Sequence, residues 1–281
     1  MIREINVKEI TRNIKEMCIE ANYTLSPDMD KAMKKAAGEE KSELGTKILN
    51  QLQENLVIAD SEKIPICQDT GMAVVFVDIG QEIHFTGGQL EEAIHEGVRQ
   101  GYTEGYLRKS VVKDPFEREN TKDNTPAIIH YNIVPGDKVK ITVAPKGFGS
   151  ENMSRIFMLK PADGIEGIKE AVLTAVRDAG PNACPPMVVG VGIGGTFEKC
   201  ALMAKEALTR EVGSHSDIPY VKELEEELLE RINKIGIGPG GLGGTTTALA
   251  VTVNTYPTHI AGLPVAVNIC CHVNRHIIRE V

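Results

Sequence analysis

Features that direct a protein to a membrane or a nucleic acid are missing from this chain of 281 residues. The longest apolar stretches, near 187–189 and 248–253, have strand length and fall far short of the roughly 20 residues that a membrane span needs. The net charge of −8 gives no excess of Lys and Arg for binding phosphates. Residues 1–17 alternate apolar and charged side chains, unlike a signal peptide. We expect a cytoplasmic protein that acts on small molecules and binds neither nucleic acid nor membrane.

The CxxC spacing of cysteines is absent as well. None of the six cysteines forms the CxxC pair typical of structural zinc, and a reducing compartment does not maintain a disulfide framework. Cys18 and Cys200 occupy amphipathic helical patterns, which predicts small apolar core residues. Cys67, Cys184 and Cys271 stand at turn-forming junctions, where a thiolate can project from a rigid loop. These three cysteines suggest an iron–sulfur cluster.

The surroundings of the three cysteines differ. Cys67 precedes a polar, turn-compatible segment that contains Gln68 and Asp69 and leads into an apolar strand. A thiol beside an amide and a carboxylate favours a functional loop over an incidental surface thiol. Prolines near Cys184 fix its backbone, which suits a rigid ligand. Of the adjacent pair 270–271 only one thiol can face a cluster, because side chains alternate along a strand.

Hydrophobic periodicity predicts an α/β fold of mixed α and β elements. Residues 1–60 form a mostly helical N-terminal cap with two helical stretches separated near 24–28, where Ser26 is the expected N-cap and Pro27 a first-turn residue. A mixed sheet with packed helices follows, with the cluster at loop ends. We expect strands near 73–77, 127–131, 139–143, 187–191, 245–254 and 265–269, and helices over 90–107, 164–179, 196–210, 221–234 and a short segment at the end. No repeat or linker marks a boundary, so we predict a single catalytic domain, 1–281.

Two glycine-rich segments allow more than one interpretation. Residues 190–195 match G-x-G-x-x-G, but a charged helix follows where a dinucleotide fold needs a parallel strand with a terminal acidic residue. Residues 240–245 either bring backbone close to a ligand or form a tight turn. Lys146 and Arg108 could bind carboxylates, although a single cation is more often a solvated surface charge. A single histidine such as His259 is by default a structural residue with its hydrogen bonds satisfied.

Together these motifs resemble the α part of the class I fumarate hydratase and L-tartrate dehydratase family, over essentially the whole chain. The segment Cys-Gln-Asp-Thr-Gly at 67–71 is its most specific motif. The resemblance implies a 4Fe–4S cluster held by Cys67, Cys184 and Cys271, with one iron open to the substrate. Cys271 is preferred over Cys270 because an arginine, here Arg275, follows the family's third ligand by four residues.

The resemblance also implies a substrate pocket. Its residues would be Gln68, Asp69, Arg108, Gly149 and His259. Phe148 departs from the family's more glycine-rich version of that loop. Asp69 and His259 would be the catalytic residues, with Asp69 giving acid/base support and His259 holding substrate oxygens together with Arg108. The open iron would act as a Lewis acid toward a C4 dicarboxylate.

Single-chain members of the family carry a second domain, so the resemblance implies a separate β subunit and an α2β2 assembly. We predict the α subunit of a fumarate hydratase, which interconverts (S)-malate and fumarate. The alternative is the α subunit of an L(+)-tartrate dehydratase, which forms oxaloacetate. Two other classes stay open, a zinc-stabilised binding module and a nucleotide-dependent oxidoreductase.

Overall fold

The computed structural model describes residues 2–281, which fold as two compact units. The first unit contains the chain up to residue 26, residues 56–148 and residues 275–281. The second unit contains residues 27–55 and 149–274. Each unit combines segments that are distant in sequence, so no single linker separates the two units. The single catalytic domain stays a prediction.

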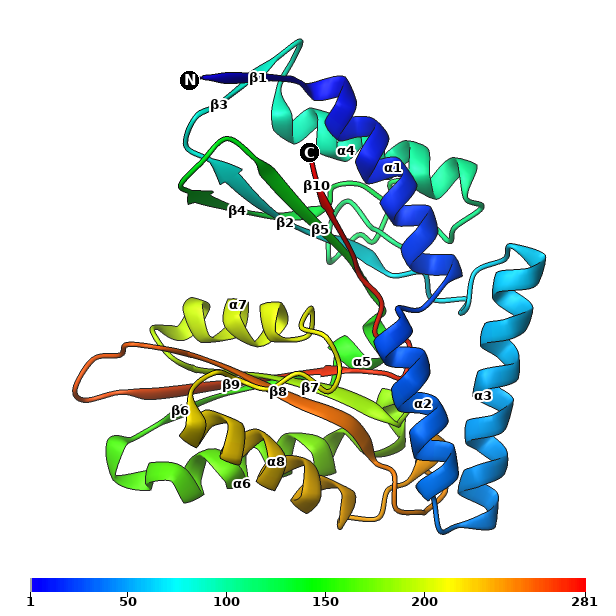
Figure 1. Cartoon of the computed structure of the whole chain (residues 1–281), viewed down its shortest axis with the longest axis vertical. Helices are drawn as coiled ribbons and strands as arrows, with labels where there is room; N and C mark the ends of the chain where they lie inside the picture. Colours follow the sequence, from blue (N-terminus) through cyan, green and yellow to red (C-terminus); the bar gives the residue numbers. More distant parts are fainter. Residues whose placement is uncertain (1) are drawn as a thin grey trace. The chain divides into compact units, whose positions relative to one another are not determined.

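The first unit is built on a mixed four-stranded sheet with the order β10-β5-β2-β4 (Figure 1). Its central strand β2 runs parallel to β4 and antiparallel to β5, and β10 adds antiparallel to β5. Strands β1 and β3 form a separate parallel pair. The strands are β1 (Arg3–Asn6), β2 (Met72–Gly80), β3 (Ile83–Thr86), β4 (Ile128–Val134), β5 (Val139–Lys146) and β10 (Ile277–Glu280).

Two helices of this unit, α1 (Val7–Tyr23) and α4 (Leu90–Glu104), pack closely because α4 presents glycines. A Cβ atom on Gly97 would lie 2.6 Å from Ile14 Cβ, and one on Gly101 would lie 2.9 Å from Cys18 Cβ. Cys18 is fully buried in this contact, and burial raises the pKa of its thiol to about 12. The prediction that Cys18 is a core residue is confirmed.

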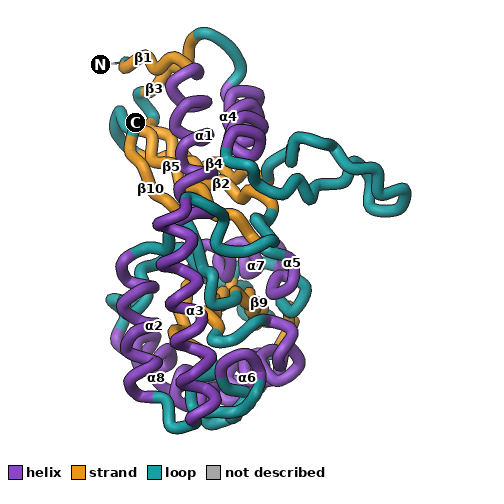
Figure 2. The backbone as a smooth tube through the Cα atoms, turned by 90° about the vertical axis from the view of Figure 1, so that its right-hand side faces the viewer, coloured by secondary structure: helices purple, strands orange, loops and turns teal. Residues whose placement is uncertain are grey.

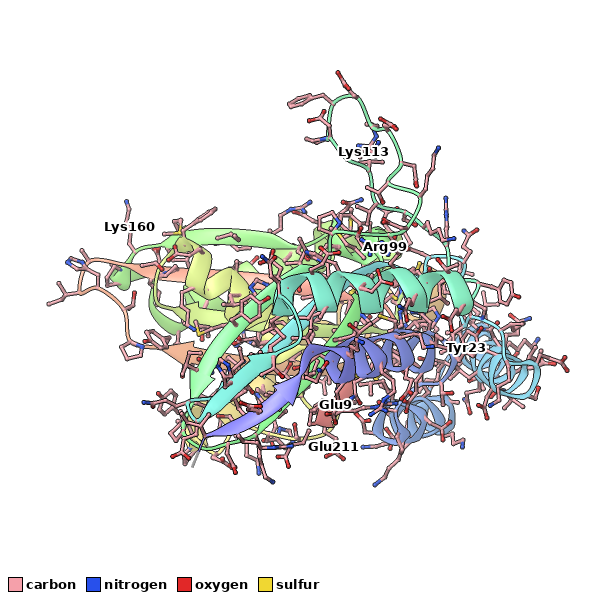
Figure 3. The ribbon with its side chains drawn as sticks, turned by 90° about the horizontal axis from the view of Figure 1, so that it is seen from above. Glu9, Tyr23, Arg99, Lys113, Lys160 and Glu211 are labelled. Atoms are coloured by element: carbon pink, nitrogen blue, oxygen red, sulfur yellow. The ribbon has the colours of Figure 1, made fainter. Side chains whose placement is uncertain are left out.

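The connection between α4 and β4 extends outward as a long loop (Figure 2). Figure 3 shows Lys113 on its outer part and Arg99 on α4. Arg99 Nε donates to Asp123 Oδ2 at 3.0 Å, which fixes the end of the loop to the helix. The loop is therefore anchored where it returns to the sheet.

The second unit contains a four-stranded sheet with the order β6-β9-β7-β8. Helix α7 covers one face, and α6 and α8 cover the other (Figure 1). The strands are β6 (Arg155–Leu159), β7 (Met187–Gly194), β8 (Ala248–Tyr256) and β9 (Leu263–Cys270). The helices are α5 (Phe148–Glu151), α6 (Gly164–Ala179), α7 (Phe197–Ala207) and α8 (Pro219–Asn233), with short 3-10 turns η1 (Pro161–Asp163), η2 (Gly180–Ala183) and η3 (Pro239–Gly241).

The N-terminal region holds one helix more than predicted. Helices α2 (Pro27–Glu39) and α3 (Glu43–Glu62) follow α1, so residues 7–57 span three helices. Helix α2 begins at Pro27 as expected, but the Ser26 hydroxyl is buried without a hydrogen-bond partner and makes no N-cap bond. The N-cap and proline signals predicted the break between the first two helices. They did not predict the second break, which follows Glu39.

The predicted helix at the end of the chain is wrong, because residues 277–280 form strand β10. Four residues gain little from a helical turn, whereas pairing with β5 supplies backbone hydrogen bonds at once. The other predicted strands and helices are present at or near the expected positions, which confirms the α/β fold class. In residues 2–281 no helix is both long and apolar enough to cross a membrane.

Candidate functional site

The segment 67–71 is the best-defined part of the candidate site in the first unit. Three buried side chains hold three successive backbone carbonyls of this segment. The pairs are Arg275 Nη2 to Asp69 O (2.5 Å), Tyr102 Oη to Thr70 O (2.8 Å) and Asn124 Nδ2 to Gly71 O (3.1 Å). Burial raises the pKa of Tyr102, which keeps its hydroxyl protonated as a donor. Buried donors from three distant parts of the chain therefore fix the loop that carries Cys67.

The carboxylate of Asp69 joins this loop to the end of β5. Its Oδ1 accepts from Gly71 N at 3.0 Å, and its Oδ2 accepts from Phe148 N at 2.8 Å. A Cβ atom on Gly147 would lie 3.0 Å from Asp69 Oδ2, so a small residue suits this approach. Both carboxylate oxygens of Asp69, the predicted acid/base residue, thus hold backbone groups in place.

Glycine is required at position 71. Gly71 has φ +75, and a Cβ atom there would lie 2.7 Å from the backbone of Lys146. Lys146 itself is only 4% exposed, so it is not a solvated surface charge. The close approach of the two segments explains why the motif ends in glycine.

Arg108 also belongs to this region. Thr70 Oγ1 donates to Arg108 O at 3.0 Å, so the backbone of Arg108 is attached to the Cys67 loop. The residue is exposed, as is Gln68. The first unit thus brings together four of the predicted site residues, Cys67, Gln68, Asp69 and Arg108.

The second unit places the segments of Cys184 and Cys271 side by side. Cys184 follows η2 in a left-handed conformation with φ 51, and Cys271 comes directly after β9. The carbonyl of Cys184 accepts from His272 N at 3.3 Å, and His272 Nδ1 lies 3.0 Å from the same oxygen. These contacts hold the two predicted ligand segments together at one end of the sheet.

A glycine-rich segment supports the Cys184 turn from behind. Gly240 N donates to Pro185 O at 2.9 Å, and a Cβ atom on Gly241 would lie 2.3 Å from Pro181 Cβ. The segment 240–245 is thus a tight turn, and its backbone lies close to Pro181 and Pro185. It limits the positions that Cys184 can adopt.

Glu40 anchors the end of this glycine-rich segment. Its carboxylate accepts from Thr245 N and Thr246 N, each at 2.8 Å, and from Ser42 N at 2.9 Å. Partial burial by itself would raise the pKa of Glu40, but the hydrogen bonds from Ser42, Thr245 and Thr246 lower it to about 2. Glu40 is therefore ionised at neutral pH and holds the segment in place.

Exposure divides the six cysteines into two groups. Cys18, Cys200 and Cys270 are buried, whereas Cys184 is exposed and Cys67 and Cys271 are half-buried. Burial also raises the pKa of Cys200, so its thiol stays protonated and unreactive near neutral pH. The predicted core position of Cys200 is confirmed.

Gly149 and His259 occupy different ends of the second unit. Gly149 lies in α5, and a Cβ atom there would be 3.8 Å from Asn182 O, beside the Cys184 turn. His259 lies in the connection between β8 and β9, where its Nδ1 accepts from Ala261 N at 3.2 Å. Strand β9 separates this connection from Cys271 by about 23 Å at the usual rise per residue. The structure does not bring His259 to the two cysteines of this unit.

In residues 2–281, no three His, Cys, Asp or Glu side chains are grouped closely enough to hold a metal ion. The donor chemistry of the loop cysteines nevertheless suits an iron–sulfur cluster, because three thiols on restrained loops offer sulfur ligands and leave one iron position open. The iron–sulfur cluster, its ligands and the substrate residues stay predictions.

Sequence analysis missed most of the residues that hold the site in place. Tyr102, Asn124 and Glu40 gave no local signal, since each acts on backbone far away in the sequence. Only Arg275 carried one, through its spacing from Cys271. Its contact with Asp69 was not predictable from that spacing.

Comparisons with known proteins give matches that cover nearly the whole chain. Residues 11–280 match the family model described as fumarate hydratase (Fumerase). A Methanocaldococcus jannaschii protein, provisionally named L(+)-tartrate dehydratase subunit alpha, is 42% identical over 97% of this chain and 98% of its own length. The L(+)-tartrate dehydratase subunit alpha of Escherichia coli strain K12 is 30% identical over 98% of this chain and 93% of its own length.

Proposed function

Because this chain belongs to the fumarate hydratase (Fumerase) family, we propose that it is the α subunit of an iron–sulfur hydro-lyase that dehydrates L(+)-tartrate. The names of the relatives support tartrate over the fumarate and malate pair that we predicted from the sequence. Fumarate hydratase is the second candidate, and the description of the family model favours it. Tartrate carries one hydroxyl group more than malate.

The exposure of the cysteines is the observation that carries the cluster proposal. The three thiols outside the buried cores are the three predicted ligands, Cys67, Cys184 and Cys271. Each lies on a loop that neighbouring residues restrain. A bound 4Fe–4S cluster with one open iron would supply a Lewis acid for the loss of hydroxide.

The chain's own residues would bind and orient the substrate beside that centre. Arg108 offers an exposed guanidinium, whose planar fork suits a carboxylate. Asp69 would assist proton transfer through its carboxylate, while the bonds from Gly71 N and Phe148 N fix where that group lies. His259 would have to hold substrate oxygens from a place remote from Cys271, so it is the weakest of the proposed site residues.

A β subunit would complete the enzyme, since the relatives are named subunit alpha. An α2β2 assembly and a cytoplasmic location are part of the same proposal. Further charged and hydroxyl groups of the substrate pocket would come from the β subunit.

The test is anaerobic purification of the chain with and without its co-expressed β subunit. We expect iron and sulfide in the protein, absorbance near 400 nm, and faster dehydration of L(+)-tartrate than hydration of fumarate in the complex. A higher rate with fumarate would favour the second candidate. A protein that binds stoichiometric zinc and takes up no iron or sulfide would support the binding-module alternative instead.

A further inference from the structure

Arg275 is a buried cation beside the candidate site, and no catalytic role accounts for it. The residue is 4% exposed and precedes β10. Burying a guanidinium is costly unless acceptors surround it, so its hydrogen bonds show what the burial achieves. Among the described residues, its Nη1 has no hydrogen-bond partner, which leaves two nitrogen atoms to make the contacts.

Those two nitrogen atoms donate to carbonyls of two different segments of the first unit. Nη2 donates to Asp69 O at 2.5 Å, and Nε donates to Pro145 O at 3.4 Å. Asp69 belongs to the Cys67 loop, and Pro145 belongs to the end of β5, just before Phe148. The Asp69 carboxylate joins the same two segments through Gly71 N and Phe148 N.

We propose that Arg275 is a positioning residue that sets the Asp69 carboxylate by fixing both backbone segments around it. The proposal rests on the proposed function only in calling that carboxylate catalytic. A charged donor makes stronger hydrogen bonds than a neutral one, and the planar guanidinium can reach two carbonyls at once. A lysine keeps the charge but offers a single point of contact, so it can replace one of these bonds and not both.

Hydrogen exchange of two amide groups tests the proposal without any turnover. Gly71 N–H and Phe148 N–H are the donors to Asp69, and their exchange reports whether its carboxylate stays in place. Exchange in the full chain should be measured by mass spectrometry for wild type, Arg275→Met and Arg275→Lys. The control is Arg279→Met, whose guanidinium binds Glu16 and Glu20 near the surface.

We expect Arg275→Met to speed exchange at these two amides about tenfold or more, since a charged hydrogen bond to the loop is lost. Arg275→Lys should give an intermediate effect, and Arg279→Met should leave both amides unchanged. Unchanged exchange in Arg275→Met overturns the proposal. So does a uniform increase across all strands of the first unit, because that marks a general loss of stability. If Arg275→Met does not fold, Arg275→Lys decides between the same outcomes.

A second measurement relates the positioning to the reaction. In the complex with the β subunit, Arg275→Lys should keep its iron and sulfide and its KM while kcat falls about tenfold. An unchanged kcat overturns the link between loop position and turnover. Absence of iron in wild type would refute the proposed function and leave the exchange result standing, so the two failures are distinguishable.

Discussion

At the scale of single residues, the Asp69 side chain that we propose for acid/base chemistry also holds backbone groups in place. Both of its oxygens accept backbone hydrogen bonds, and its own carbonyl is held by Arg275. The carboxylate therefore has a fixed place before any substrate binds, which is what a catalytic group needs. The residues that fix it are as much part of the site as the residue itself.

We expect Asp69→Asn to keep the cluster and lose turnover by about a hundredfold or more, because an amide is a poor proton acceptor. An amide also offers only one acceptor oxygen, so one of the two backbone donors loses its partner. Steady-state rates and iron content of the complex measure the two effects separately. A fully active Asp69→Asn enzyme would remove Asp69 from the mechanism.

The adjacent cysteines 270 and 271 allow a matched test of the third ligand. Cys270 is 4% exposed at the end of β9, whereas Cys271 lies just beyond the strand and is half-buried. Cys271→Ser should lose the iron and sulfide of the anaerobically purified protein, while Cys270→Ser should retain them. The reverse result would assign the ligand to Cys270.

At the scale of elements, the glycines of β7 explain a motif that suggests nucleotide binding. A Cβ atom on Gly190 would lie 2.1 Å from Ala204 O, and one on Gly192 would lie 2.0 Å from Cys200 O. Both carbonyls belong to α7, so these glycines allow the helix to lie directly on the strand. The motif G-x-G-x-x-G here reflects close packing of a helix on a sheet.

Gly192→Ala should destabilise the chain by about 3 kcal/mol, because the added methyl group would overlap a helix carbonyl. Gly38→Ala is the control, since no atom lies within 4 Å of a Cβ added there in α2. That change should stabilise the chain by about 0.5–1 kcal/mol, as alanine favours a helix. Denaturant unfolding of both variants measures the difference, and equal stabilities would contradict the packing explanation.

Side chains protect the edge strand β8 of the second sheet. Asn233 Oδ1 accepts from Thr247 N and Ala248 N, and Glu225 Oε1 accepts from Val253 N. Both residues lie on α8, which packs along the strand. The helix thus covers backbone groups that an open sheet edge would otherwise expose.

At the scale of the whole chain, Glu40 joins segments 205 positions apart. Its carboxylate fixes Thr245 and Thr246, and the glycine-rich segment before them packs on the Cys184 turn. Because hydrogen bonds lower the pKa of Glu40 to about 2, its contribution to stability is present at neutral pH. That contribution is lost as the pH falls from the ordinary carboxyl range, near 4.5, through 2.

We therefore expect Glu40→Gln to lower the free energy of unfolding at pH 7 by about 1–2 kcal/mol. The difference from wild type should shrink steadily as the pH approaches 2, because wild-type Glu40 then becomes protonated. Thermal unfolding between pH 7 and 2 measures this trend, with Glu39→Gln as the exposed neighbouring control. A difference that does not change with pH would show that the charge of Glu40 is not responsible.

The sequence by itself determined the elements whose signal is local and strong. Helix α6 follows the predicted boundaries, and the apolar runs of β2, β5 and β7 give strands, because β-branched side chains favour strands. Turn chemistry located the loops of Cys67 and Cys184 in the same way. Burial of the helical cysteines Cys18 and Cys200 followed from amphipathic spacing alone.

Only the tertiary structure decided which distant groups meet. The last strand β10 forms because β5 offers an edge, and its four residues carry no periodicity of their own. Tyr102, Asn124 and Arg275 converge on three successive carbonyls near Cys67, while His259 lies at the far end of β9 from Cys271. Hydrogen bonds between residues remote in sequence depend on how strands and helices are ordered in space. Local sequence patterns do not specify that order.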